Sequence, residues 1–141
     1  MRQSLTATLE AAPDPADVRL VREGLGEFNR RYAPDDGHSL LTVFLRDADH
    51  AVVGGLLGGT YWGWLHVDIL WIREDFRRAG HGQAMLQMAE QEAVRRGCRH
   101  AHLETHDFQA LPFYEKHGYA VFARLPDLPE GHIKYFMKKE L

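Results

Sequence analysis

A turn rich in glycine and arginine connects an apolar stretch, Val67–Ile72, to a segment of helical periodicity, Gly82–Arg96. The turn consists of Phe76, Arg77, Arg78, Ala79, Gly80, His81, Gly82 and Gln83. A helix that begins directly after such a turn exposes backbone N–H groups without partners, at the positive end of its dipole. Glycines allow a bulky anion to approach these groups, and the arginines add positive charge. The pattern therefore predicts a ligand that carries phosphate.

Other interpretations of this turn compete with that prediction. A dinucleotide-binding fingerprint requires a third small residue three positions after the second glycine, where this chain has Met85. The P-loop pattern Gly-x-x-x-x-Gly-Lys does not occur in the sequence. An ordinary loop whose basic residues face water is the remaining alternative. From this turn alone, the phosphate site and the ordinary loop both stay open.

The composition is that of a globular chain, and we expect a single domain over residues 1–141. Of the 141 residues, 45% are hydrophobic and 26% are charged, which is ordinary for a chain with a buried core. The net charge of −3 and the lack of a basic cluster argue against nucleic acid as a partner. We expect no membrane segment, because the sequence has neither a signal-peptide core nor a run of about 18 apolar residues. The single cysteine, Cys98, excludes an internal disulfide, so a cytoplasmic protein is expected.

Periodicity along the chain predicts an α/β fold with a mixed sheet. Alternation and apolar runs predict strands at residues 3–10, 40–46, 51–60, 99–105, 119–125 and 133–139, and one more that ends at Ile72. Apolar residues at helical spacing predict helices from residue 15 to about 31, at 82–96 and at 108–116. The expected order is β-α-β-β-β-α-β-α-β-β, which places helices on both faces of the sheet.

Two motifs together resemble one known family. The segment Arg77–Gly82 matches Arg/Gln-x-x-Gly-x-Gly/Ala, the pyrophosphate-binding turn of the GCN5-related N-acetyltransferases. The segment Asp107–Tyr119 resembles that family's second motif, Asn-x-x-Ala followed by Tyr-Glu-Lys-x-Gly-Phe. The resemblance covers roughly residues 40–141. It implies the same order of elements, a sheet that splays between the family's fourth and fifth strands, and acetyl-CoA as co-substrate without a metal.

The resemblance also implies which residues contact the acetyl-CoA. The turn would hold the pyrophosphate, and the backbone of the preceding strand would pair with the pantetheine arm, with an N–H near Leu70 or Trp71 at the thioester oxygen. The expected contacts are Leu70, Trp71, Ile72, Arg77, Arg78, Ala79, Gly80, His81, Gly82, Gln83, Asp107, Ala110, Phe113 and Tyr114. Asp107 departs from the family's asparagine. A carboxylate only accepts hydrogen bonds whereas an amide also donates, so this contact is an open question.

Acyl transfer to an amine needs an acid for the leaving thiolate and a route for the proton of the amine. The resemblance implies that Tyr114 is the general acid, and a tyrosine with the ordinary pKa of about 10 keeps its proton at neutral pH. His66 and Asp68 lie on one side of a strand by two-residue alternation. We expect His66 to act as the base, with Asp68 either orienting it or binding a cationic amine. Ordered water is the alternative route for the proton.

A second set of ligand-type residues alternates along one strand. His100, His102 and Glu104 share a strand face, and imidazole and carboxylate groups bind metal ions. A metal centre is therefore an alternative interpretation of this strand. The family resemblance favours packing at these positions instead, because the family needs no metal.

These observations predict an acetyl-CoA-dependent N-acetyltransferase. We expect direct attack by a primary amine of a small molecule in a ternary complex. No covalent enzyme intermediate is expected, because Cys98 follows a helix end and no Ser-His-Asp or Cys-His arrangement is evident. A protein lysine or an N-terminal amine is the alternative acceptor, and a non-catalytic acyl-CoA-binding sensor is the alternative from another class. Family members often pair through a sheet edge, which makes a homodimer a further expectation.

Overall fold

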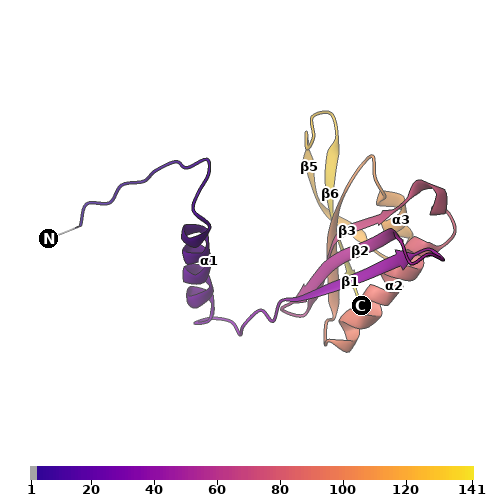
Figure 1. The fold of residues 1–141 in the computed structure, drawn as a ribbon, viewed down its shortest axis with the longest axis horizontal. Coiled ribbons are helices and arrows are strands. Elements are labelled where there is room, and N and C mark those ends of the chain that lie inside the picture. The colour runs from indigo at the N-terminus through magenta and orange to yellow at the C-terminus, as the bar shows by residue number, and fades with distance from the viewer. Residues whose placement is uncertain (1–2) are drawn as a thin grey trace. The chain divides into compact units, whose positions relative to one another are not determined.

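The structure is a computed structural model that describes residues 3–141 (Figure 1). The chain divides into two compact units, one that ends at Asp36 and one that comprises Gly37–Leu141. The expectation of a single domain therefore stays a prediction. None of the helices in the described residues is long and apolar enough to cross a membrane.

The N-terminal unit contains helix α1 (Pro15–Asn29). Its N-cap is Asp14, whose carboxylate accepts a hydrogen bond of 2.8 Å from the backbone N–H of Ala16. Pro15 occupies the first turn, where a missing N–H removes no intrahelical hydrogen bond. The helix start that the sequence predicts is therefore confirmed, with the capping residue that carboxylates favour.

The strand expected at residues 3–10 is wrong. These residues have no regular secondary structure, and their side chains are exposed. Alternation of Leu5, Ala7 and Leu9 with polar residues describes side chains only, whereas a strand also needs a neighbouring strand for its N–H and C=O groups. Among the described residues the sheet begins at Ser39 and includes no pairing with this segment. The observed order is therefore α-β-β-β-α-β-α-β-β.

The C-terminal unit is built on a six-stranded mixed sheet, which confirms the expected α/β class. Its strands are β1 (Ser39–Arg46), β2 (Val52–Tyr61), β3 (Trp64–Ile72), β4 (His100–His106), β5 (Ala120–Pro126) and β6 (Ile133–Glu140). Its helices are α2 (His81–Arg95), α3 (Leu111–Lys116) and the short 3₁₀ turn η1 (Glu74–Phe76). The strand order is β1-β2-β3-β4-β6-β5, and β3–β4 is the parallel pair.

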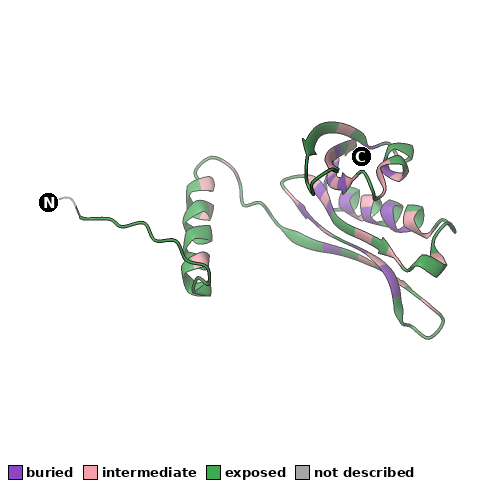
Figure 2. Ribbon diagram, turned by 90° about the horizontal axis from the view of Figure 1, so that it is seen from above, coloured by how far each residue is buried: buried purple, intermediate pink, exposed green. Residues whose placement is uncertain are grey.

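Helix α2 packs against β1, β2 and β3. It buries one face, and Figure 2 shows this face as a row of buried residues along the helix. The buried residues of α2 are Met85, Leu86, Ala89 and Ala93. They recur at intervals of three and four, which confirms the periodicity read from the sequence. The sheet contributes Leu56, Leu65, Leu103 and Met137 to the same core.

The parallel strands β3 and β4 separate halfway along their length. They pair from Trp64 opposite His100 to Val67 opposite Leu103, and the pairing ends there although β3 continues to Ile72. Beyond this point β4 remains paired with β6 on its other side. The expected splay, which the family has between its fourth and fifth strands, is thus confirmed between β3 and β4, and within residues 3–141 it leaves one edge of β3 without a neighbouring strand.

A β-bulge distorts β3 at the point where the two strands separate. The register between β2 and β3 shifts after Leu57: Leu57 pairs with Ile69 and Gly58 with Val67, so Asp68 has no paired residue on β2. Gly58 lies at this shift, and a Cβ added to it would collide with the backbone carbonyl oxygen of His66. The close approach of the two backbones explains why glycine stands at this position.

Candidate active site

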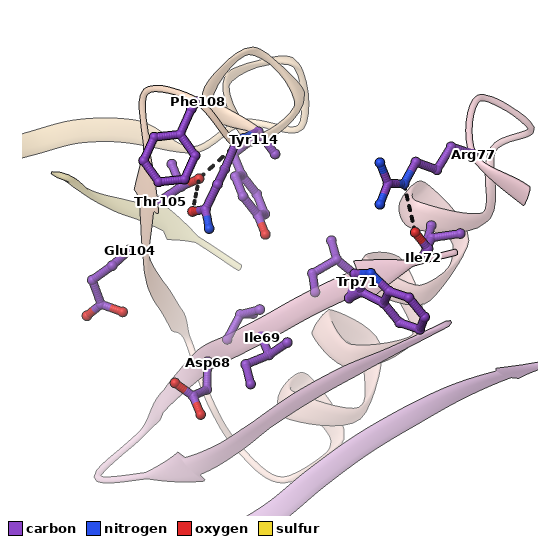
Figure 3. Close-up of a pocket in the computed structure, with 13 residues that line it drawn as sticks. Asp68, Ile69, Trp71, Ile72, Arg77, Glu104, Thr105, Phe108 and Tyr114 are labelled. Carbon is purple, nitrogen blue, oxygen red and sulfur yellow. Dashed lines mark hydrogen bonds between the residues drawn. The ribbon is translucent and has the colours of Figure 1, made fainter. Parts of the chain in front are cut away.

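A cavity of about 510 Å³ occupies the gap between the separated strands (Figure 3). One wall is β3, and the other is formed by the end of β4 and the start of α3. Its lining residues are Val67, Asp68, Ile69, Leu70, Trp71, Ile72, Arg77, Glu104, Thr105, Phe108, Gln109, Ala110 and Tyr114. The splay of the sheet therefore produces a pocket at the carboxyl ends of two parallel strands, a common position for ligand sites in such sheets.

The glycine turn forms the N-terminus of α2. Gly80 is the N-cap and has a φ of 84°, in the left-handed region that favours glycine, and no side chain caps the helix. The guanidinium Nε of Arg77 donates a 2.7 Å hydrogen bond to the carbonyl oxygen of Ile72, which places Arg77 at the cavity (Figure 3). The first turn of α2 thus presents backbone N–H groups without a side-chain partner, which is the arrangement that binds anions.

Several residues expected to contact acetyl-CoA do not line the cavity. Arg77 is the one residue of the turn among its lining residues. Those outside it are Arg78, Ala79, Gly80, His81, Gly82, Gln83, Asp107 and Phe113. Phe113 nevertheless packs close to the turn, because its ring lies 3.4 Å from the position of a Cβ on Gly82.

Tyr114 lies on α3 and points its hydroxyl group into the cavity (Figure 3). The residue is only 6% exposed, and its ring contacts those of Phe113 and Tyr119 at centroid distances of 5.2 and 5.8 Å. Burial raises the pKa of Tyr114 to about 12. Its hydroxyl therefore carries a proton at neutral pH and can donate it inside the cavity.

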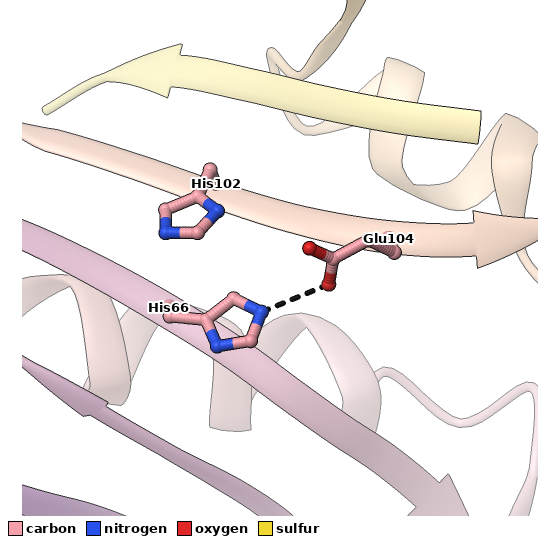
Figure 4. Close-up of side chains that lie close together, drawn as sticks. All are labelled: His66, His102 and Glu104. Atoms are coloured by element: carbon pink, nitrogen blue, oxygen red, sulfur yellow. Dashed lines mark hydrogen bonds and ion pairs between the residues drawn. The ribbon is translucent and has the colours of Figure 1, made fainter. Parts of the chain in front are cut away.

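His66 has two close partners across the β3–β4 pair. Its Nε2 lies 2.8 Å from Oε2 of Glu104, and its ring stacks on that of His102 at a centroid distance of 4.5 Å (Figure 4). An ionised carboxylate only accepts, so Nε2 is the nitrogen that donates, and in the neutral imidazole Nδ1 then has the lone pair. His102 in turn lies 3.1 Å from the hydroxyl of Tyr61 through its Nε2. Burial, with His66 as a smaller cause, lowers the pKa of His102, while Glu104 acts in the opposite direction.

The sequence paired His66 with the carboxylate of Asp68, but in the structure the carboxylate that contacts His66 is that of Glu104. Asp68 lies in the bulge and lines the cavity, whereas Glu104 holds the imidazole. Glu104 comes from another strand, 38 residues along the chain, so strand alternation around His66 did not indicate it. The parallel register of β3 and β4 would have been the necessary signal.

Asp107, the residue that departs from the family motif, is bound elsewhere. Its two carboxylate oxygens lie 2.9 Å from Nδ1 of His132 and 3.2 Å from the backbone N–H of Ile133, which donates to it. The side chain thus joins the end of β4 to the start of β6 and does not line the cavity. Its expected contact with the coenzyme stays a prediction, and the structure shows a structural use for the carboxylate.

Thr105, Phe108 and Gln109 line the pocket but were not among the contacts expected from the sequence. The hydroxyl of Thr105 donates to Oε1 of Gln109 at 3.4 Å and accepts from the N–H of Ala110 at the same distance. Phe108 adds an aromatic ring to the wall. Thr105 lies near the end of β4, and Phe108 and Gln109 lie in the turn after it, so only the position of this segment beside β3 reveals them.

Comparison of the sequence and the structure with known proteins identifies the family of this chain. Residues 5–119 match the Acetyltransferase (GNAT) family. A blasticidin-S acetyltransferase from Streptomyces morookaense is 43% identical over 91 residues, which cover 64% of this chain and 67% of that protein. A crystal structure of an Agrobacterium tumefaciens protein assigned as an acetyltransferase has a TM-score of 0.89 at 31% identity and covers 97% of this chain and 100% of its own.

A more distant structure shares the fold alone. It comes from Bacillus anthracis strain Ames, is assigned as a streptothricin acetyltransferase and was solved in complex with acetyl coenzyme A. Its TM-score is 0.65 at 16% identity, with 79% of this chain and 67% of that chain covered.

The chain belongs to the GNAT acetyltransferase family. The resemblance drawn from the two motifs is confirmed, and so is the acetyltransferase class, for which this family uses acetyl-CoA as the acetyl donor. The acceptor and the roles of individual residues are a separate question, which the geometry of the pocket addresses.

Proposed function

We propose that this protein transfers the acetyl group of acetyl-CoA to a primary amine of a small molecule, with Tyr114 as the general acid. The observation that carries the proposal is the position of the Tyr114 hydroxyl, which is protonated and points into the cavity between β3 and β4. An acid is useful there, because the departing thiolate of coenzyme A takes up a proton as the carbon–sulfur bond breaks.

Two features support the binding of acetyl-CoA, one on the C-terminal half of β3 and one at the start of the helix that follows it. The uncapped N-terminus of α2, with Arg77 beside it, offers N–H groups and positive charge to the pyrophosphate. Along Ile69–Trp71 one edge of β3 has no neighbouring strand, so the pantetheine arm can add to the sheet as a further strand. Together these features orient the thioester toward Tyr114.

The chemical step forms one bond and breaks one. The amine nitrogen attacks the thioester carbon, the carbon–sulfur bond breaks, and the sulfur takes the proton of Tyr114. The amine attacks in its neutral form and then loses a proton to Nδ1 of His66, directly or through water, while Glu104 holds the imidazole in the required tautomer through Nε2. His66 then releases this proton to solvent and Tyr114 takes one up, which restores both groups. No covalent intermediate is needed on Cys98, which is buried and whose pKa is raised by burial.

The acceptor is proposed to be a small cationic amine. Two carboxylates, Asp68 and Glu104, line the cavity and favour a positively charged substrate. The likeness to a blasticidin-S acetyltransferase supports a small-molecule acceptor such as an antibiotic. Asp68 lies in the bulge at the mouth of the splay and is the residue we assign to amine binding.

A Tyr114→Phe substitution tests the proposal. We expect kcat with acetyl-CoA and blasticidin S, or another amine from a panel of antibiotics and polyamines, to fall by about 10²–10⁴. Acetyl-CoA affinity, measured by calorimetry, should stay nearly unchanged. Tyr119→Phe is the matched control, because Tyr119 packs on Tyr114 but its hydroxyl lies 3.4 Å from Glu90 instead of in the cavity.

Three results would contradict the proposal. Equal rates for Tyr114→Phe and the wild type would exclude Tyr114 as the acid. Equal losses for both tyrosine variants would indicate a packing role. Acetyl-CoA binding without transfer to any amine, peptide amines included, would identify an acyl-CoA sensor.

A further inference from the structure

Three metal-ligand side chains meet where β3 and β4 begin to separate. His66 and His102 are directly opposite each other in the parallel register, and Glu104 follows two residues later on the same strand (Figure 4). One ligand atom from each lies within 4.8 Å of the others. The sequence pattern had grouped His100 with His102 and Glu104. In the structure His66 takes the place of His100 in this group, because the pairing of β3 with β4 puts His66 opposite His102. His100 instead contacts Glu140 through Nδ1 at 2.8 Å.

We propose that His66, His102 and Glu104 form a binding site for a divalent transition-metal ion of the zinc type. Two imidazoles and one carboxylate are a ligand set that zinc accepts, with a fourth position left for water. Two ligand atoms that share a tetrahedral zinc ion lie about 3.4 Å apart. The widest separation in the cluster is therefore closed by side-chain rotation of about 1 Å, without movement of the strands.

The cluster has the supporting contacts that a metal site needs. The hydroxyl of Tyr61 lies 3.1 Å from Nε2 of His102, and Figure 4 shows the other ring nitrogen of His102 facing the Glu104 carboxylate. A second hydrogen bond of this kind fixes the tautomer and orientation of a ligating histidine. The two rings are stacked nearly parallel, with an angle of 16° between their planes, so they must rotate for their in-plane lone pairs to converge on one ion.

An ion can reach the site. The side chains of His66 and Glu104 are 28% and 27% exposed, and Glu104 also lines the cavity that opens between the strands. On binding, the ion takes the position of the proton on Nε2 of His66, and the neutral imidazole becomes the tautomer whose proton is on Nδ1.

The metal would act as an inhibitor, and this part rests on the proposed function. An imidazole bound to metal through Nε2 carries its remaining proton on Nδ1. Nδ1 is the nitrogen proposed to accept the proton of the amine, so a bound ion removes the base. Transfer in the presence of zinc should fall, and a chelator should restore it.

The test measures metal binding directly, so that it does not depend on acetyl transfer. Untagged protein is titrated with Co²⁺ alone, whose visible absorption reports tetrahedral ligands, and with Zn²⁺ in a calorimeter. We expect one ion per chain. His102→Gln should weaken Co²⁺ binding by more than about 100-fold, and Tyr61→Phe by about 10-fold.

The matched control is His100→Gln, which removes a histidine from the same strand but not from the cluster. It should bind Co²⁺ as the wild type does. A wild type without tetrahedral absorption overturns the proposal, and so does an equal loss of affinity in the two histidine variants. Binding that depends on His102 in a protein without acetyl transfer supports the metal site while the proposed function fails. Acetyl transfer in a protein that does not bind Co²⁺ supports the proposed function and overturns the metal site.

Discussion

Helices α1 and α2 have the same length, 15 residues, but different N-termini. The carboxylate of Asp14 caps α1, and Asp17 adds a second negative charge in its first turn. Helix α2 starts at Gly80 with neither a side-chain cap nor an acidic residue in its first turn. The positive end of α1 is therefore neutralised by its own chain, whereas that of α2 is available to a ligand.

Burial explains how α2 tolerates an uncapped start. It buries four residues against the sheet, whereas α1 has no buried residue within the described part of its unit. A helix that packs poorly depends on local contacts such as its cap, and a helix held by packing does not. The fold thus stabilises α2 from one side and leaves its N-terminus free for anion binding.

The largest expected effect is on the free energy of unfolding, and it arises from the different packing of the two helices. Leu86 of α2 is 1% exposed and Leu25 of α1 is 60% exposed. Leu86→Ala should lower the free energy of unfolding by about 2–5 kcal/mol, because it leaves a cavity in the core. Leu25→Ala should change it by about 0.5 kcal/mol or less. Denaturant unfolding measures both, and equal losses would refute the contrast.

A carboxylate placed at Gly80 would give the start of α2 a negative charge, as Asp14 and Asp17 do for α1. Gly80→Asp should weaken acetyl-CoA binding by about 100-fold, or about 2.7 kcal/mol, because a negative charge then occupies the anion site. Gly80→Asn is the matched control, since asparagine has the same shape and tolerates a positive φ but has no charge. Calorimetric titration with acetyl-CoA measures the affinities.

Two results would decide against the anion site at α2. Equal affinities for the aspartate and asparagine variants would mean that charge at this terminus is irrelevant. Loss of acetyl-CoA affinity in Asp14→Ala, which alters the other helix, would show that the effect is not specific to α2.

The smallest expected effect concerns the C-terminal ends of the helices. Helix α1 has no basic residue in its last turn, whereas Arg95 and Arg96 hydrogen-bond Glu92 near the end of α2. These bonds, first that to Arg95, lower the pKa of Glu92 to about 2. A lowered pKa stabilises the fold above the ordinary value of 4.5, and this contribution is lost as the pH falls toward 2.

Glu92→Gln should therefore lower the melting temperature slightly at pH 7, and the difference from the wild type should shrink between about pH 5 and pH 2. Added salt should also reduce the difference, because the pair is exposed. Thermal melts at several pH values measure it. A difference that grows as the pH falls would contradict the assignment.

Local features of this fold were predictable from the sequence. The helix expected from residue 15 begins at Pro15, and the helical periodicity expected over residues 82–96 matches the buried face of α2. These features depend on residues within one or two turns of each other, so periodicity and capping rules detect them. The failure at residues 3–10 follows from the same limit, because a strand is stable only with a partner.

The candidate site divides in the same way. The sequence by itself determined the glycine turn before α2, the tyrosine of α3 and the ligand-type residues of β3 and β4, since each belongs to a short motif. Tertiary structure decided that Glu104, and not Asp68, holds His66, that His102 stacks on it, and that a cavity lies beside them. The physical reason is the parallel pairing of β3 with β4, which joins strands 28 residues or more apart and then ends after Val67 and Leu103.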